Sequence, residues 1–166
     1  TISAYENLIS AAERRTLING ETHTQVRVSD LWGVIPSITG KIELVYEGEQ
    51  EGAGFVAQNL IGKAIRAQFI KYYPNPEAEK KKKDKSAYKP ILDWFGDGQS
   101  IDILSDASNS DYKKALSAVP GLAEVIGKQF SQHSEEDKLF LMEFVLHGLT
   151  EYSLLSRKVL TAGLQF

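Results

Sequence analysis

The sequence contains no cysteine, and this absence excludes several chemistries at once. Disulfides, thiolate nucleophiles, iron–sulfur clusters and cysteine-ligated zinc all need that side chain. The absence is also typical of proteins of the reducing cytoplasm, where we expect this chain to lie. With 166 residues the chain can bury a core without a disulfide or a structural metal, as one domain or one domain with a small appendage.

Long apolar runs and an excess of positive charge are also missing. No stretch approaches the roughly 18–20 consecutive apolar residues of a membrane-spanning helix, and the most apolar run, residues 139–146, is interrupted by Glu143. The first residues do not resemble a signal peptide, because no basic segment precedes an apolar one. The net charge of −3 is not that of a typical nucleic-acid-binding domain. We therefore expect neither a membrane nor a nucleic acid as partner.

The chain begins at Thr1 without a methionine and enters a helical pattern at once, so we interpret it as a fragment of a longer protein. Apolar residues recur every three or four positions and predict an amphipathic helix from Tyr5 to Ile18. Its apolar positions are Tyr5, Leu8, Ile9, Ala12 and Leu17. Residues 25–28 alternate enough for a brief strand or an extended arm.

A second helix is predicted from Ser29, whose hydroxyl can cap its first turn. Pro36 interrupts this helix, and we expect it to restart directly afterwards and to continue to Val45. The glycines at positions 48, 52 and 54 indicate that it has ended by Glu47.

A long helix is predicted over residues 53–72, with two apolar stripes that would be covered on both sides. One stripe holds Val56, Leu60, Ala64 and Ala67, and the other holds Phe55, Ile61, Ile65 and Phe69. Pro74 and Pro76 end this helix. Residues 77–89 are polar and rich in lysine, which predicts a solvated, mobile loop with almost nothing to bury.

Two interpretations are open for residues 91–103. Gly96-Asp97-Gly98 can form the turn of a β-hairpin, because Ile101 and Ile103 alternate with polar neighbours after it. The alternative is a helix that ends at Phe95. We favour the hairpin.

Two short helices are predicted over residues 111–118 and 122–130. The strongest helix begins at Ser134, which can cap it ahead of three acidic residues. This helix is apolar nearly all round from Leu139 to Leu146, as expected for the central element of a bundle, whereas the residues after Arg157 would fray or dock as a short arm. The predicted fold class is therefore mainly α: a helical bundle with one small β-hairpin.

The segment GKIELVYEGEQEG, residues 40–52, combines a Gly-Lys pair with four carboxylates. A phosphate-binding loop needs Ser or Thr after its lysine, and neither Lys41 nor Lys63 is followed by one. The acids could in principle meet a hard cation, but they lack the alternating spacing of a calcium loop. We interpret them as a solvated turn between helices. These acids are Glu43, Glu47, Glu49 and Glu51.

Glu143, His147 and Glu151 follow one another at four-residue intervals on one face of the last helix. Such a row could serve a metal ion or a proton transfer. A nearly all-apolar helix would show the same pattern along its one solvent-exposed stripe, and we favour this structural interpretation. His23 and His133 lie in polar stretches that indicate no site.

Two clusters of basic residues remain. Lys80–Lys83 could attract an acidic partner, but acids surround the run and no aromatic residue interrupts it, so we predict a solvated loop. Arg14 and Arg15 are adjacent on the first helix, and we expect them to make surface ion pairs.

The first part of the chain resembles the helical lid that follows the ATPase core in AAA+ proteins of the MoxR and magnesium-chelatase type. That lid has a helix, a short turn that approaches an aspartate, and then further helix. The resemblance rests on the segments TISAYENLISAAERRTLINGET and QVRVSDLWGVIPSITGKIEL, and PSITGKIELVYEGEQEG is similar to bacterial magnesium-chelatase-like ATPases in particular.

The resemblance implies lid-like helices over residues 1–47 and a helical C-terminal extension over residues 48–166. It implies a parent protein that forms a ring and uses ATP and Mg²⁺ to remodel a client protein or to insert a metal. The nucleotide motifs and the sensor arginine would precede Thr1. No catalytic, cofactor-binding or metal-binding residue is therefore carried over, and the implied partners are the missing core, neighbouring subunits and an unknown client.

Two other functions stay open from the sequence. The chain could be a stand-alone helical protein-interaction module, unconnected to nucleotides. It could also be a small metal-dependent hydrolase that uses the face formed by Glu143, His147 and Glu151.

Overall fold

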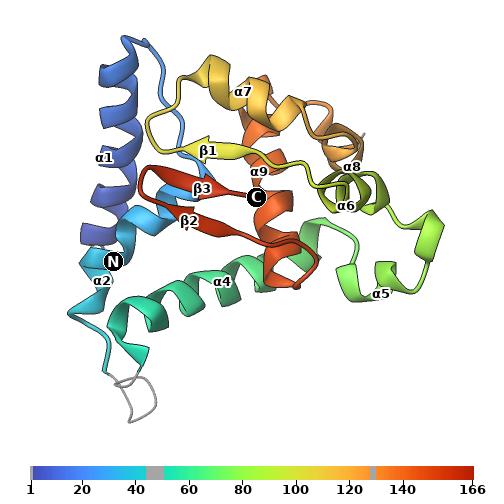
Figure 1. The fold of residues 1–166 in the computed structure, drawn as a ribbon. Helices are drawn as coiled ribbons and strands as arrows, with labels where there is room; N and C mark the ends of the chain where they lie inside the picture. Colours follow the sequence, from blue (N-terminus) through green and yellow to red (C-terminus); the bar gives the residue numbers. More distant parts are fainter. Residues whose placement is uncertain (1, 44–50, 128–129) are drawn as a thin grey trace.

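The computed structural model describes residues 2–43, 51–127 and 130–166, and in these ranges the chain is mainly helical with a small antiparallel sheet (Figure 1). This confirms the predicted fold class. The α-helices are α1 (Ile2–Asn19), α2 (Ile35–Thr39), α4 (Ala53–Tyr72), α5 (Pro76–Lys80), α6 (Lys89–Gly96), α7 (Asn109–Ser117), α8 (Leu122–Ile126) and α9 (Glu135–Glu151). The 3₁₀ helices are η1 (Val28–Val34) and η2 (Lys83–Lys85), and the strands are β1 (Asp102–Leu104), β2 (Lys158–Leu160) and β3 (Gly163–Gln165).

Helix α9 is the central element of the fold, as its sequence predicted. Val145, Leu146 and Leu149 have no exposed surface, and α4, α7, α8 and η1 all contact this helix. The Ser134 hydroxyl accepts a hydrogen bond from the backbone N–H of Asp137, and three acidic residues occupy the first turn. The hydroxyl oxygen pairs with an N–H group that has no partner within the helix, and the acidic side chains stabilise the positive end of the helix dipole.

Glycines allow α4 and α9 to cross closely. A Cβ atom built at Gly148 of α9 would overlap the ring of Phe69, which is fully buried on α4. A Cβ atom at Gly62 of α4 would likewise overlap the carboxylate of Glu151. The close crossing depends on Gly148, because the buried Phe69 ring cannot move aside, whereas at Gly62 the overlapping atoms are the end of a flexible side chain.

The small sheet has the strand order β1-β3-β2, and both of its pairings are antiparallel. Ile103, Leu164 and Val159 are directly opposite one another across the three strands. Ile103 and Leu164 are buried, so this side of β1 and β3 closes one side of the core.

The predicted hairpin over residues 91–103 is wrong, and the alternative of a helix ending near Phe95 is confirmed. Residues 89–96 form α6, which ends where Gly98 adopts a φ of 83° and donates its N–H to the carbonyl of Phe95. Glycine tolerates this left-handed conformation and commonly ends helices. The hairpin of the fold is instead β2–β3, in the tail that was expected to fray or dock.

Two other expectations for connecting segments are corrected. Residues 25–27 form no strand, and the predicted helix from Ser29 to Val45 is the 3₁₀ helix η1 followed by α2, which ends at Thr39. The predicted Lys-rich loop, residues 77–89, contains most of α5 and all of η2, and it buries Glu79 and Tyr88. The predicted end of a helix by Glu47 lies outside the described residues.

The helical stripes are only partly as expected. Helix α1 buries Ala12 and Arg15, whereas Tyr5 and Leu17 are 66% and 82% exposed. Helix α4 buries Ile65 and Phe69 of one stripe but leaves half of Leu60 exposed, so it is covered on one side rather than both. Periodicity alone cannot separate a side that meets the core from one that meets solvent. None of the described helices is long and apolar enough to cross a membrane.

Replacement of Gly148 by alanine should lower the free energy of unfolding by about 1–3 kcal/mol, because a methyl group has to displace the buried Phe69 ring. Urea unfolding followed by circular dichroism measures this change. Gly54→Ala is the matched control: it lies in α4, and a Cβ atom there meets nothing within 4 Å. Equal stability of the two variants would contradict the close crossing.

Candidate functional site

Two buried carboxylates, Asp30 and Glu143, organise the polar interior of the protein. Asp30 lies in η1, and its carboxylate accepts hydrogen bonds from the two terminal guanidinium nitrogens of Arg15, at 2.7 and 3.1 Å. Arg15 also donates to the carbonyl oxygen of Gln25 at 2.7 Å, and the N–H of Arg27 donates to Asp30 at 2.7 Å. The arm formed by residues 21–27 is thereby held against α1 by side chains rather than by a strand.

The neighbouring arginines of α1 therefore differ in environment. Arg14 makes the expected exposed ion pair, with Asp106. The expectation of a surface pair is wrong for Arg15, which is only 2% exposed. A charge in the interior is tolerated only when it is paired and hydrogen-bonded, as Arg15 is here.

Glu143 connects α9 to the arm and to α7. Its carboxylate accepts the backbone N–H groups of Val28 at 2.7 Å and of Ser29 at 2.9 Å, and the hydroxyl of Tyr112 at 2.7 Å. Burial alone would raise the pKa of Glu143, but the adjacent His147 and the hydrogen bonds from Tyr112 and Ser29 outweigh it and lower the pKa. Glu143 is therefore a charged carboxylate in the core at neutral pH.

His147 lies one turn further along α9 and is also fully buried. Its Nδ1 atom is 3.0 Å from a guanidinium nitrogen of Arg157. A guanidinium only donates, so Nδ1 accepts and the neutral ring carries its proton on Nε2. Nε2 is 3.5 Å from the Glu143 carboxylate. Burial lowers the pKa of His147, although Glu143 opposes this shift.

Arg157 joins the C-terminal hairpin to this row. It donates to Glu151 at 3.0 Å and lies over the Trp32 ring, 4.4 Å from the ring centroid. Trp32 and Phe166 cover the imidazole of His147, with ring centroids at 4.9 and 5.0 Å. The imidazole is therefore enclosed by residues of η1, the hairpin and α9.

Arg27 completes the buried polar cluster. Its guanidinium lies over the Tyr112 ring, 4.0 Å from the centroid, and donates to the side chain of Asn109 at 3.2 Å. Its other terminal nitrogen has no hydrogen-bond partner within the described ranges. Burial lowers the pKa of Arg27, and burial together with Glu143 raises that of Tyr112.

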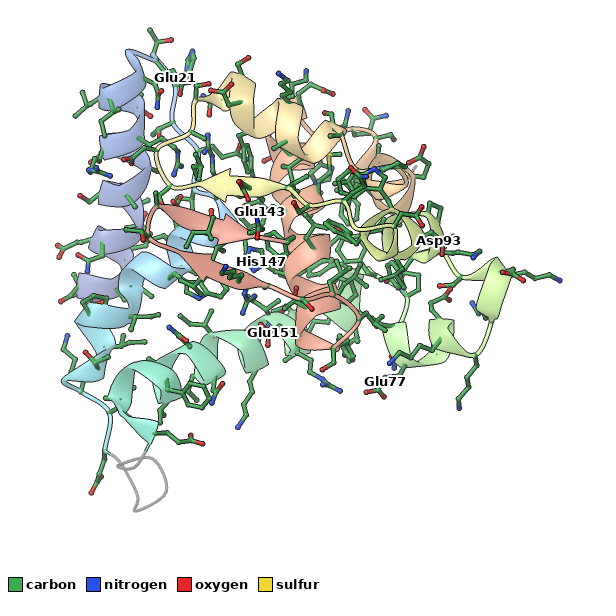
Figure 2. The ribbon with its side chains drawn as sticks, in the orientation of Figure 1. Glu21, Glu77, Asp93, Glu143, His147 and Glu151 are labelled. Carbon is green, nitrogen blue, oxygen red and sulfur yellow. The ribbon has the colours of Figure 1, made fainter. Side chains whose placement is uncertain are left out.

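The predicted row of Glu143, His147 and Glu151 does lie along one face of α9 (Figure 2). Its interpretation as a solvent-exposed stripe is wrong, because Glu143 and His147 have no exposed surface. Only Glu151 is partly exposed, with 20% of its side chain accessible. Among the described residues, no three His, Asp or Glu side chains are grouped so that they could hold a metal ion.

The enclosed geometry limits what these groups can do chemically. A general base must come within hydrogen-bonding distance of a substrate proton. Glu143 instead accepts three protein donors, and His147 is shielded by two aromatic rings. The contacts of Glu143, His147 and Arg157 instead hold the arm, α7, α9 and the hairpin together, and we call these three residues the clamp.

The other candidates from the sequence lie apart from this cluster. His23, His133 and Glu51 are exposed, as is Glu43. Glu47 and Glu49 lie outside the described residues. Lys63 is an exposed residue in the middle of α4, and Lys41 follows α2 in a turn. Lys80, Lys81 and Lys82 are exposed, and Lys82 pairs with the buried Glu79.

Several members of the cluster were not found from the sequence. Arg27 and Asp30 lie at the start of η1, Tyr112 lies on α7 and Arg157 immediately precedes β2, and no spacing along the chain links these three places. The one local signal was the pair of polar residues, Glu143 and His147, within an otherwise apolar helix. Such a pair indicates either exposure or a buried network, and only the tertiary contacts distinguish the two.

The chain was compared with models of protein families, with curated proteins and with solved structures, and none of them matches. The resemblance to the lid of AAA+ ATPases therefore stays a prediction. So does the division into residues 1–47 and 48–166, although Glu143 hydrogen-bonds across that boundary.

Replacement of Glu143 by glutamine should lower the free energy of unfolding by about 2–4 kcal/mol, since a side-chain NH₂ would face buried N–H donors.

Tyr112→Phe should lower the free energy of unfolding by about 1–2 kcal/mol, because it removes one hydrogen bond and keeps the ring under Arg27. Urea titrations measure both values. A Tyr112→Phe protein as stable as the parent would contradict the clamp.

Stability should fall as the pH is lowered from 7 to 5. The pKa of His147 lies below its ordinary value of 6.5 in the folded protein, so the unfolded chain takes up the proton first. The lowered pKa of Glu143 places its own contribution below pH 4.5, outside this window. Arg157 contacts Nδ1 of the ring, and Glu151 in turn pairs with Arg157.

The midpoint of urea unfolding at pH 7, 6 and 5 measures this dependence. We expect His147→Gln to flatten the profile and the exposed His133→Gln to leave it unchanged. A slope that survives in His147→Gln would show that another group causes it.

Proposed function

We propose that this chain is the C-terminal helical region of a magnesium-chelatase-like AAA+ ATPase. In this role it has no catalysis of its own. It contributes lid contacts to the ATPase core and contacts to neighbouring subunits or to a client protein. ATP and Mg²⁺ bind to the core, and the parent protein works in the cytoplasm on remodelling or metal insertion.

The observation that carries this proposal is the exposure of apolar side chains on α1, the first helix of the lid-like part. Ile2 and Leu17 are 75% and 82% exposed, and Tyr5 and Ile18 are also more than half exposed. Ile2 and Tyr5 lie at the start of α1 and Leu17 and Ile18 at its end, and another protein surface laid along this helix would cover them. A lid helix that packs against an ATPase core needs such a face.

The order of elements is compatible with the lid that the resemblance implies. Helix α1 is followed by an extended arm that approaches Asp30, and then by η1 and α2. Because Glu143 accepts two N–H groups at the end of that arm, a movement of the lid-like part would be transmitted to α9. This contact gives the extension a physical means to respond to the nucleotide state of the core.

The interior does not favour the alternative of a hydrolase. A general base has to come within hydrogen-bonding distance of a substrate proton, and Glu143 and His147 of the predicted row are both sealed from solvent. No substrate reaches them unless the core opens. The alternative of a stand-alone interaction module uses the same exposed face of α1 and differs only in what covers it.

The first test is a calorimetric titration of the chain with ATP and Mg²⁺, for which we expect no binding. The coding sequence upstream of Thr1 should also contain a Walker A and a Walker B motif within about 250 residues. Tight ATP binding by the chain alone, or an upstream region without these motifs, would rule out the proposal. An upstream region without these motifs would favour the alternative of a stand-alone interaction module.

In the parent protein, Leu17→Asp should lower the ATPase rate or ring assembly severalfold, because a charge cannot be buried against the core. Val159→Asp is the matched control, since Val159 is 59% exposed and lies on the hairpin. The ATPase rate and the mass in solution report the effect. Equal rates for both variants would exclude α1 as the contact.

A further inference from the structure

An apolar groove of about 420 Å³ lies where the end of α4 meets the first half of α9. This volume falls within the range of roughly 300–1,000 Å³ found for small-molecule sites. Four of the lining residues are aromatic: Tyr72 of α4, Phe130 before α9, and Phe140 and Phe144 of α9. Aromatic walls with a few polar groups are the usual composition of a ligand site.

The lining side chains of each helix share one face. On α9, Asp137, Phe140 and Phe144 follow one another at intervals of three and four residues, so their side chains are neighbours along the groove. On α4, Gln68 and Tyr72 are four residues apart in the same way. The carboxylate of Asp137 and the aromatic walls therefore converge on one space.

The aromatic walls are open on one side and supported on the other. Tyr72 is 49% exposed, and Phe140 and Phe144 are half-buried. Behind them the ring of Phe144 packs against the buried rings of Phe69 and Tyr73, with centroids at 5.9 and 6.2 Å. A ligand would thus meet aromatic surface that the core already holds in place.

The groove has a single negative charge and no opposing one. Asp137 accepts a hydrogen bond from the Ser134 hydroxyl through one oxygen, at 2.8 Å. It has no cationic partner in the part of the chain that the structure describes, since its neighbour Lys138 pairs with Glu135. Among the described residues that line the groove, none is a lysine or an arginine. The charge of Asp137 is therefore available to a cationic ligand.

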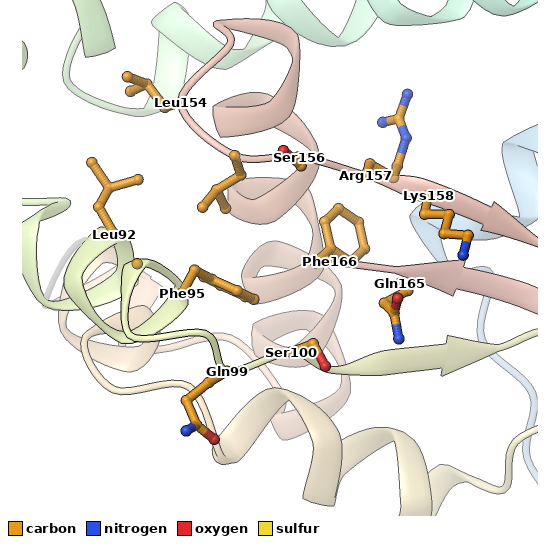
Figure 3. A pocket seen from close by; sticks show the side chains of 12 residues that line it. Leu92, Phe95, Gln99, Ser100, Leu154, Ser156, Arg157, Lys158, Gln165 and Phe166 are labelled. Carbon is orange, nitrogen blue, oxygen red and sulfur yellow. The ribbon is translucent and has the colours of Figure 1, made fainter.

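The cavity between α6 and the C-terminal hairpin has a similar volume, about 440 Å³, but a different arrangement of charge (Figure 3). Arg157 and Lys158 lie at its border and point away from Phe95 and Phe166 in Figure 3. No charged side chain of its described lining is thus directed at its apolar wall. Of the two spaces, the groove between α4 and α9 is the one in which a charge and aromatic side chains meet.

We propose that the groove between α4 and α9 binds a small organic cation, a substituted ammonium group on an apolar body. The body packs against Tyr72 and Phe144, and the ammonium group lies beside Phe140 and the Asp137 carboxylate. Aromatic faces attract cations, and walls of this kind recognise substituted ammonium groups in other proteins. The site is independent of the role proposed above, because no residue of α1 lines it.

A matched set of ligands tests the charge that the groove selects. The probes are 4-phenylbutan-1-amine, 4-phenylbutan-1-ol and 4-phenylbutyrate, which are cationic, neutral and anionic at pH 8. Backbone amide shifts of the ¹⁵N-labelled chain give both the affinity and the place of binding. We expect the amine to bind about tenfold more tightly than the alcohol, the acid more weakly than either, and the shifts to cluster around Tyr72 and Phe140.

Two acid-to-amide variants separate the groove from the helix end. Asp137→Asn should reduce the preference for the amine over the alcohol to about twofold or less. Glu136→Gln is the matched control, because it removes an exposed charge from the same helical turn without lining the groove, and it should retain the preference. Urea unfolding shows that both variants are folded.

Tyr72→Leu tests the aromatic contribution, since leucine keeps an apolar wall but has no ring. It should weaken the binding of the amine more than that of the alcohol. The proposal is overturned if amine and alcohol bind equally to the native chain, or if the amide shifts lie away from the groove. It is also overturned if Asp137→Asn and Glu136→Gln have the same effect.

Discussion

The buried carboxylate of Glu143 is the interaction on which the rest of the structure depends. It accepts two adjacent backbone N–H groups at the start of η1 and the hydroxyl of Tyr112 on α7. A charged group in the core is unfavourable unless its hydrogen bonds are complete, so each donor has to be in place for the others to be useful. The arm, α7 and α9 therefore have one mutual arrangement that satisfies this charge.

Two further contacts extend this constraint to both ends of the chain. Asp30 lies next to the N–H groups that Glu143 binds, and it holds Arg15 of α1. On the other side His147 meets Arg157, which brings in the C-terminal hairpin. Segments that are more than a hundred residues apart are thus joined by polar contacts, while the apolar core around Phe69 and Leu146 supplies most of the burial.

Much of the helical framework could be predicted from local patterns. The bounds of α4 and the start of α9 followed from glycine, proline and a capping serine, because helix ends are decided by residues within one turn. The hairpin was assigned to the wrong segment, since strand pairing depends on a partner that can lie anywhere in the chain. β1 pairs with β3, some sixty residues later, as the Asp102–Gln165 register shows.

The sequence by itself determined that the protein is mainly helical, where α4 begins and ends, where α9 begins, and that α9 is too apolar to lie on the surface. Tertiary structure alone decided that Glu143 and His147 face inwards, and it assembled the cluster from elements that share no spacing. The physical reason is that a polar residue in an apolar helix can be satisfied by water or by protein donors. Those donors, the N–H groups of Val28 and Ser29 and the hydroxyl of Tyr112, are brought to Glu143 only by folding.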